Sequence, residues 1–167
     1  YGMTENGSHQ YTSPTDLMDV ITATCGKACN GYEVRLWQPD NPDLEAVPGE
    51  VGEIGGRGGV LMLGYFDNQS ATEASFNSRG WFMSGDLGRF DGDGNLEIVG
   101  RKKDLIIRGG HNIHPSHIEE FAHRHPAVKK AAAFGVPDER LGEKVCLAII
   151  GDGAPPAAEE LLAHLAR

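Results

Sequence analysis

The amino-acid sequence predicts an α+β fold with a β-rich first part, residues 1–102, and a smaller α/β second part, residues 104–167, joined at Lys103. Short strand-like runs separated by turns rich in Gly and Pro fill the first part, while two helical patterns interrupt the strand-like runs of the second. The junction, Gly100–Gly110, joins a basic cluster, a short apolar run and a double glycine. Glycine permits close approaches that a side chain blocks. We therefore interpret the junction as a hinge followed by a ligand-facing turn; a plain β-turn beside a solvated charge cluster is the alternative.

Strand-like segments are expected in the first part at Tyr32–Trp37, Glu50–Ile54, Trp81–Leu87 and Leu96–Val99. Gly55–Gly59 is expected to turn the chain sharply, and it lacks the Lys-Ser/Thr of a phosphate-binding P-loop. A short helix capped by Thr72 is expected to close at Arg79-Gly80. Asp91–Asn95 is expected to form a hairpin turn rather than a calcium loop, because it lacks the glutamate that completes such a loop.

The sequence of the second part predicts a three-stranded sheet with two helices. The expected strands are Leu105–Ile107, Val128–Val136 and Lys144–Ile150, and the expected helices run from Ser116 to about Arg124 and from Pro155-Pro156 onward. Ser116–Glu119 has the pattern of a capping box at the start of the first helix. His111, His114 and His117 are spaced by three. Pro115 starts rather than continues a helix, which disfavours a shared metal-binding face for these histidines.

The composition is that of a globular chain, because 40% of its 167 residues are hydrophobic. No apolar run approaches the roughly 18 residues of a membrane span, and no charged-then-apolar amino terminus predicts secretion, so a cytoplasmic location is expected.

The formal net charge of −9 argues against general nucleic-acid binding, which needs a basic face. Cys25, Cys29 and Cys146 lack the ligand spacing of a zinc site and are interpreted as reduced, small apolar residues.

Three stretches carry the residue types of nucleotide chemistry. Tyr1–Glu5 places a small residue, a hydroxyl and a carboxylate within five positions, which suits a phosphate and its Mg²⁺; a capped loop is the alternative. Asp86 follows a glycine at the end of an aromatic strand, where a carboxylate can accept both hydroxyls of a ribose; a turn aspartate is the alternative. The overall negative charge opposes an anionic ligand, so local cations must hold it. The dense cationic group of the chain consists of Arg101, Lys102, Lys103 and Arg108.

Taken in order, four stretches resemble successive core motifs of the adenylate-forming superfamily of acyl-CoA synthetases, nonribosomal-peptide adenylation domains and firefly-type luciferases. The stretches are Tyr1–Glu5, Gly52–Ile54 with Gly64-Tyr65, Ser84–Leu87, and Gly100–Asp104 running to Asn112-Ile113 and Ile118-Glu119. One such motif is a weak indication, whereas four in the same order are specific. The sequence of Ile106–Ile113 is most similar to medium-chain, aryl and alicyclic acid:CoA ligases, with cyclohexanecarboxylate:CoA ligases as the nearest group.

The resemblance implies an ATP-dependent acid:CoA ligase. In that family a carboxylate attacks the α-phosphate of Mg·ATP to give an acyl-adenylate and pyrophosphate, and the thiol of CoA then displaces AMP. It implies that residues 1–102 are the end of the large AMP-binding domain, a distorted barrel-like subdomain, and that residues 103–167 are a hinge and a truncated α/β lid. The implied ligands are a carboxylic acid, ATP or AMP, Mg²⁺ and CoA, and a homodimer is left open.

The resemblance also implies roles for individual residues of the nucleotide site. Tyr1 would stack on or flank adenine, with Gly2 beside it. Thr4 would contact the α-phosphate and Glu5 would hold Mg²⁺, so these two are the implied catalytic residues. Asp86 would bind the ribose hydroxyls.

Further roles follow from the same resemblance. Arg101 would bind the ribose or a phosphate, and Lys103 would be the hinge about which the lid rotates between the two half-reactions. Gly109 and Gly110 would line the channel for the pantetheine of CoA. The residues placed near the acyl group are Ser8 and His9.

Two elements of the family pattern are absent: the Ser/Thr/Gly-rich phosphate loop far upstream and a lysine late in the lid. Because groups that stabilise charge on the transferring phosphate are usually the largest catalytic contribution, we expect this chain to be part of a longer protein and to be inactive alone. Two alternatives stay open. One is a non-catalytic nucleotide-binding or interaction module, and the other is an adenylation domain that loads the thiol of a carrier protein.

Overall fold

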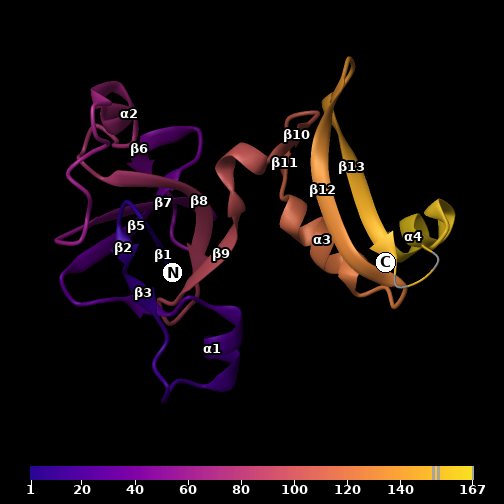
Figure 1. The fold of residues 1–167 in the computed structure, drawn as a ribbon, viewed down its shortest axis with the longest axis horizontal. Coiled ribbons are helices and arrows are strands. Elements are labelled where there is room, and N and C mark those ends of the chain that lie inside the picture. The colour runs from indigo at the N-terminus through magenta and orange to yellow at the C-terminus, as the bar shows by residue number, and fades with distance from the viewer. Residues whose placement is uncertain (152, 154, 167) are drawn as a thin grey trace. The chain divides into compact units, whose positions relative to one another are not determined.

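The computed structural model describes residues 1–151, 153 and 155–166 (Figure 1). The chain divides into two compact units, Tyr1–Lys102 and Lys103–Arg167. Each unit contains a sheet and helices of its own, and the strands of each sheet come from a single unit. The predicted α+β class is therefore confirmed.

The main sheet of the first unit contains five antiparallel strands among the described residues, in the order β6-β5-β7-β8-β9 (Figure 1). The strands are β5 (Tyr32–Gln38), β6 (Asn41–Glu45), β7 (Gly52–Gly58), β8 (Phe82–Phe90) and β9 (Leu96–Arg101). The sheet is open rather than closed into a barrel, and β6 and β9 are its edges. Pro42 lies in β6, which suits an edge strand because proline cannot donate to a ladder.

Shorter elements complete the first unit. Two two-stranded ribbons pair β1 with β2 and β3 with β4. Their bounds and those of the helices are β1 (Gly2–Met3), β2 (Gly7–Ser8), β3 (Gln10–Tyr11), β4 (Lys27–Ala28), α1 (Met18–Ala23) and α2 (Gln69–Ala74). The buried cluster Leu36, Ile54 and Leu96 lies on the main sheet, and Tyr1 and Cys25, which lie just before β1 and β4, pack against it.

The expected turn at Gly55–Gly59 is wrong, because β7 continues through Gly58. The glycines serve to make space rather than to turn the chain. A Cβ on Gly55 would collide with the indole of Trp37, which is fully buried. The glycines of β7 thus let the aromatic rings of Trp37 and Tyr32 in β5 pack against its backbone, which is a recognised reason for glycine inside a strand.

The short helix α2 lies earlier in the chain than expected. Its N-cap is Asn68, whose side-chain oxygen accepts a hydrogen bond from the amide of Ala71 at 3.0 Å. Thr72 lies inside the helix, where its hydroxyl donates to the carbonyl of Asn68 at 3.0 Å. Because asparagine caps a helix at least as well as threonine, the helix begins earlier, and it ends at Ala74 rather than at Arg79-Gly80.

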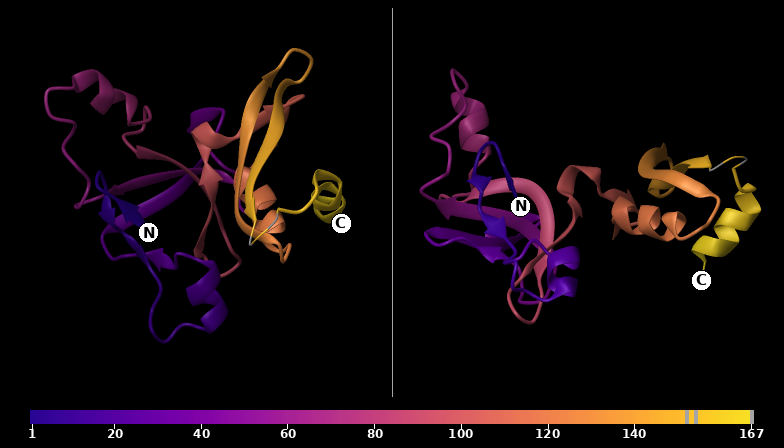
Figure 2. Two further views of the ribbon diagram at one scale, coloured as in Figure 1. Left: turned by 45° about the vertical axis from the view of Figure 1, so that its right-hand side comes forward. Right: turned by 60° about the horizontal axis from the view of Figure 1, so that its bottom comes forward.

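The second unit contains a four-stranded antiparallel sheet among its described residues, in the order β11-β10-β13-β12, with α3 packed along β12 (Figures 1 and 2). A 3-10 turn, Lys102–Asp104, precedes it. Its elements are β10 (Ile106–Arg108), β11 (His111–Ile113), α3 (Pro115–His123), β12 (Val128–Asp138), β13 (Gly142–Gly151) and α4 (Ala158–Leu165).

Two expectations for this unit are corrected. The sheet has four described strands rather than three, because the double glycine Gly109–Gly110 folds β11 back onto β10. The capping box at Ser116–Glu119 is wrong, since α3 begins at Pro115 and its N-cap His114 makes no side-chain cap bond. Glu119 instead accepts a hydrogen bond from the amide of Ala133 at 2.9 Å. Its carboxylate therefore ties the helix to β12.

The helices of both units are short. Within residues 1–151, 153 and 155–166, none has the length and apolar character needed to cross a membrane.

Replacing Gly55 by alanine should lower the free energy of unfolding of the first unit by about 1–3 kcal/mol, because forcing extra atoms into a packed core usually costs this much. Chemical denaturation followed by tryptophan fluorescence provides the measurement. Gly59→Ala is the matched control, because a Cβ at Gly59 would have no other atom within 4 Å. Equal destabilisation by both substitutions would show that the indole of Trp37 does not depend on the space at Gly55.

Candidate functional site

The carboxylate of Asp86 is the centre of the candidate site in the first unit. Its Oδ2 accepts a hydrogen bond from the Tyr1 hydroxyl at 2.6 Å, and its Oδ1 accepts one from Arg101 Nε at 2.9 Å. Asp86 is only 9% exposed, so this carboxylate is fixed among protein donors. The structure therefore brings together three residues that the sequence analysis assigned to one nucleotide site.

The β8–β9 hairpin explains why Asp86 and Arg101 meet. They are directly opposite each other in the register of the two strands, and opposite charges on facing positions attract. The hairpin turn at Asp91–Asn95 is confirmed: Asp91 Oδ1 accepts hydrogen bonds from the amides of Asp93 and Asn95 at 2.9 and 2.8 Å. The turn and the register shift between Leu87 and Gly88 together fix which residue of β9 faces Asp86.

Gly85 gives the strand a local kink just before the carboxylate. Its φ of 75° lies in the left-handed region that favours glycine. The amide of Asp86 donates to Ser84 Oγ at 3.1 Å, and the register of β8 with β9 shifts between Leu87 and Gly88. A bulge of this kind commonly re-aims a side chain at a functional site.

Tyr1 is held as a hydrogen-bond donor. Burial of its ring raises the pKa of the hydroxyl well above its usual value, and the hydrogen bond to Asp86 raises the pKa further. The hydroxyl therefore stays protonated at neutral pH. The backbone carbonyl of Tyr1 also accepts hydrogen bonds from the amides of His9 and Gln10 at 3.1 and 3.0 Å, which anchors this end of the site.

Glu53 is a site residue that the sequence analysis did not assign to any role. It is 4% exposed, and its carboxylate accepts hydrogen bonds from the amide of Gly85 at 3.2 Å and from Lys102 Nζ at 2.7 Å. It therefore supports the kink that carries Asp86. The local sequence carries no signal for this role, because β7 also contains Arg57, which is charged but exposed.

Thr4 and Glu5 lie in the tight turn between β1 and β2, with Gly2 in β1. A Cβ on Gly2 would collide with the facing strand. Glu5 Oε1 accepts a hydrogen bond from the Tyr65 hydroxyl at 3.1 Å, while Thr4 is exposed. The described residues contain no cluster of three or more metal-ligating side chains. One accessible carboxylate nevertheless suits Mg²⁺, which often uses one or two protein carboxylates together with the phosphates of a nucleotide.

His9 is fully buried, and Ser8 beside it is exposed. The His9 ring stacks on Tyr32 at a centroid distance of 4.3 Å and meets the edge of Tyr1 at 5.4 Å. Burial lowers the pKa of His9 to about 4, so the ring is neutral at pH 7. Neither ring nitrogen has a hydrogen-bond partner among the described residues. The placement of Ser8 and His9 near an acyl group stays a prediction.

The remaining predicted residues belong to the second unit. Lys103 lies in the 3-10 turn Lys102–Asp104, and its role as a hinge stays a prediction. Gly109 and Gly110 form the turn between β10 and β11, with φ of 59° and 83°. The amide of Gly109 donates to the carbonyl of Leu141 at 2.8 Å.

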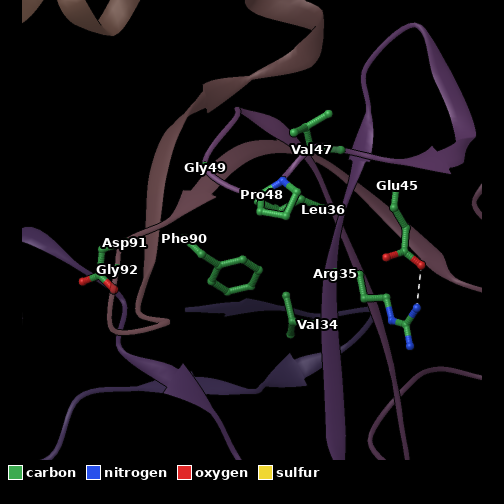
Figure 3. A pocket seen from close by; sticks show the side chains of 11 residues that line it. Val34, Arg35, Leu36, Glu45, Val47, Pro48, Gly49, Phe90, Asp91 and Gly92 are labelled. Atoms are coloured by element: carbon green, nitrogen blue, oxygen red, sulfur yellow. Dashed lines mark hydrogen bonds and ion pairs between the residues drawn. The ribbon is translucent and has the colours of Figure 1, made fainter.

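A pocket of about 490 Å³ in the first unit contains none of the predicted site residues (Figure 3). Phe90, Val34 and Pro48 give it an apolar wall, and the ion pair between Arg35 and Glu45 lies at one side. This pocket offers an apolar surface, and its two carboxylates, Glu45 and Asp91, already bind Arg35 and the amides of the hairpin turn. The chemistry of the site therefore rests on the Asp86 cluster rather than on this cavity.

Parts of known proteins match the chain. Residues 117–167 match the AMP-binding enzyme C-terminal domain family. The whole chain aligns at 40% identity with the salicyl-AMP ligase / salicyl-S-ArCP synthetase of Mycobacterium tuberculosis, and 99% of it aligns at 34% identity and a TM-score of 0.90 with the crystal structure of ATP-bound MatB from Rhodopseudomonas palustris. The chain is similar over its whole length to members of the adenylate-forming superfamily.

Other members of the superfamily match nearly as well. The medium-chain fatty-acid–CoA ligase of Escherichia coli is 37% identical over 90% of the chain. The o-succinylbenzoate CoA synthetase of Bacillus subtilis with its acyl-adenylate intermediate is 35% identical over 98% of the chain, with a TM-score of 0.86. The chain spans only 29% of the mycobacterial ligase, 26% of the E. coli ligase and 33% of each of the two solved chains.

Proposed function

We propose that the full-length protein is an AMP-forming acid:CoA ligase, and that the first unit supplies the ribose- and phosphate-binding part of its nucleotide site. The observation that carries the proposal is the Asp86 carboxylate held by Tyr1 and Arg101. The matched superfamily members support it, since they include structures with bound ATP, AMP and an acyl-adenylate.

The carboxylate of Asp86 keeps lone pairs that could accept the hydroxyls of a ribose. An ionised carboxylate has about four lone-pair sites, and protein donors occupy one on each oxygen. The remaining lone pairs can accept the two ribose hydroxyls, and hydrogen bonds to a charged group are stronger than neutral ones. Both protein partners donate to the carboxylate, so Asp86 acts as an acceptor. The proposed role is therefore recognition of ribose rather than proton transfer.

The phosphate end of the nucleotide would meet Thr4 and Glu5. We propose that the exposed Thr4 hydroxyl donates to the α-phosphate and that Glu5, positioned by Tyr65, holds Mg²⁺. Bound Mg²⁺ neutralises charge on the phosphate oxygens. Local groups of this kind are necessary because the chain has a net charge of −9, which opposes an anionic ligand.

The second unit would act in the thioester-forming half-reaction. We propose that Lys103 is the hinge of a lid and that Gly109 and Gly110 line the passage for the pantetheine of CoA. The open backbone of this turn supports the passage, because a Cβ on Gly110 would have no other atom within 4 Å. A cytoplasmic location and a homodimer stay predictions.

The proposed acid is a medium-chain, aryl or alicyclic carboxylic acid, in keeping with the names of the matched ligases. Ser8 and His9 are the residues proposed to lie near it. Ser8 is exposed and could contact the acid, whereas His9 is fully buried between Tyr1 and Tyr32 and would support Ser8 from behind.

A carrier-protein thiol is the second candidate for the acyl acceptor. The observation that favours it is the 40% identity with a salicyl-AMP ligase / salicyl-S-ArCP synthetase. The 2,3-dihydroxybenzoate-AMP ligase of Bacillus subtilis also matches, at 38% identity over 99% of the chain. The two candidates share the adenylation step and differ only in the thiol that receives the acyl group.

Acid-dependent exchange of pyrophosphate into ATP tests the proposal in the full-length protein. We expect exchange with at least one acid of a medium-chain, aryl and alicyclic panel, followed by acyl transfer to CoA. Transfer to a phosphopantetheinylated carrier protein and not to CoA would establish the second candidate. Nucleotide binding without exchange for any acid would identify a non-catalytic module and contradict the proposed ligase.

Lys103→Pro should separate the two half-reactions, because proline fixes φ near −65° and a hinge must change its backbone angles. We expect formation of the acyl-adenylate to survive and thioester formation to fall by about tenfold or more, since only the second step needs the Gly109–Gly110 turn delivered to the acyl group. Burst release of pyrophosphate and acyl-CoA formation are measured separately.

Lys103→Ala controls for the loss of the charge and should affect both steps far less. An equal fall of both half-reactions in the proline variant, or no fall in either, would show that the lid does not turn at Lys103.

A further inference from the structure

The β10–β11 hairpin, which carries the Gly109–Gly110 turn, has few backbone links to the rest of its sheet. Among the described residues, its register with β13 consists of the single pair Arg108 and Gly142. The amide of Gly109 adds a hydrogen bond to the carbonyl of Leu141 at 2.8 Å. These backbone bonds, together with the buried side chain of Ile106 in β10, set where the turn lies.

Glu143 provides a further link, in this case from a side chain. Its Oε2 accepts a hydrogen bond from the amide of Ile107 at 2.6 Å. The distance is short, as is usual for a charged acceptor. Glu143 is the residue after Gly142 on β13, so this bond lies one position away from the register pair and completes a short row of attachments.

Gly135 on β12 leaves the space that the Glu143 carboxylate occupies. A Cβ on Gly135 would come within 2.6 Å of Glu143 Oε1 and 2.8 Å of its Cδ, closer than real Cβ atoms approach other atoms. The backbone φ of Gly135 lies outside the left-handed region. A Cβ at Gly135 would therefore displace this one carboxylate, so the glycine provides its room and is not needed for its backbone angles.

The loop before Glu143 is itself fixed. Asp138 Oδ1 accepts hydrogen bonds from the amides of Arg140 and Leu141 at 3.1 and 2.8 Å, and Asp138 pairs with Lys144. Leu141, whose carbonyl holds the Gly109 amide, is thus held in place. The β12–β13 hairpin forms a firm support, and Glu143 is a side chain that connects this support to β10.

We propose that Glu143 is a positioning residue for the Gly109–Gly110 turn and controls acyl transfer to the thiol without controlling adenylation. The proposal rests on the proposed ligase function and on the role proposed for this turn. Its physical basis is that Glu143 touches the strand leading into the turn and belongs to the second unit, whereas the Asp86 cluster lies wholly in the first.

The test uses the full-length protein with both half-reactions measured separately. Glu143→Ala should lower kcat/KM for the thiol substrate by about tenfold or more, because a hydrogen bond to a charged group is lost. The same variant should leave pyrophosphate exchange within about twofold of wild type.

Gly135→Ala should act in the same direction by displacing the carboxylate. Glu143→Gln keeps an acceptor oxygen and should restore most of the transfer rate. Glu139→Ala, in the exposed loop of the same hairpin, is the control for charge.

Amide hydrogen exchange gives a second measurement that does not depend on turnover. The Ile107 amide should exchange faster in Glu143→Ala than in wild type and stay protected in Glu143→Gln, while the amides of α3 should be unchanged. Unchanged thiol transfer in Glu143→Ala, or an equal fall of both half-reactions, would overturn the proposal. Absence of pyrophosphate exchange in wild type would instead overturn the proposed function, so the two failures are distinguishable.

Discussion

The carboxylate of Asp86 is the point at which three separate segments of the first unit meet. Tyr1 approaches one oxygen and Arg101 the other, at 2.6 and 2.9 Å, while Glu53 supports the preceding glycine from a third strand. Because these donors hold the carboxylate before any ligand arrives, its remaining lone pairs are already directed. Because the side chain is already fixed, binding of a ligand loses less conformational entropy than it would if the side chain had first to be ordered.

The two units divide the proposed chemistry. The first presents a fixed acceptor and one accessible carboxylate, Glu5, near the candidate phosphate position. The second presents a glycine turn whose position depends on a few bonds from β13, Glu143 among them. A rigid nucleotide site and a thinly attached turn suit a reaction in which one substrate stays bound while a second arrives. The boundary between Lys102 and Lys103 separates these two kinds of structure.

Much of this arrangement could be predicted from the sequence. Asp86 and Arg101 were assigned to one site, and the hairpin turn between their strands follows from the Asp, Gly and Asn residues of Asp91–Asn95. The register shift between Leu87 and Gly88, which brings Arg101 opposite Asp86, has no such signal in the sequence. The rest could not be predicted because it depends on contacts between distant segments. The role of glycine in β7 is visible only once Trp37 is seen to fill the space. Glu53 binds Gly85 and Lys102, which both lie far from it in the sequence, so no local pattern indicates that these residues meet.

The most direct test of the account compares ATP with 2′-deoxy-ATP and 3′-deoxy-ATP in acid-dependent pyrophosphate exchange, for wild type and for Asp86→Ala. If Asp86 receives the ribose hydroxyls, wild type should lose about tenfold or more in kcat/KM with a deoxynucleotide, since a hydrogen bond to a charged group is removed. Asp86→Ala should be impaired with ATP but should distinguish the three nucleotides little. Equal use of all three by wild type, or an undiminished preference for ATP in Asp86→Ala, would contradict the account.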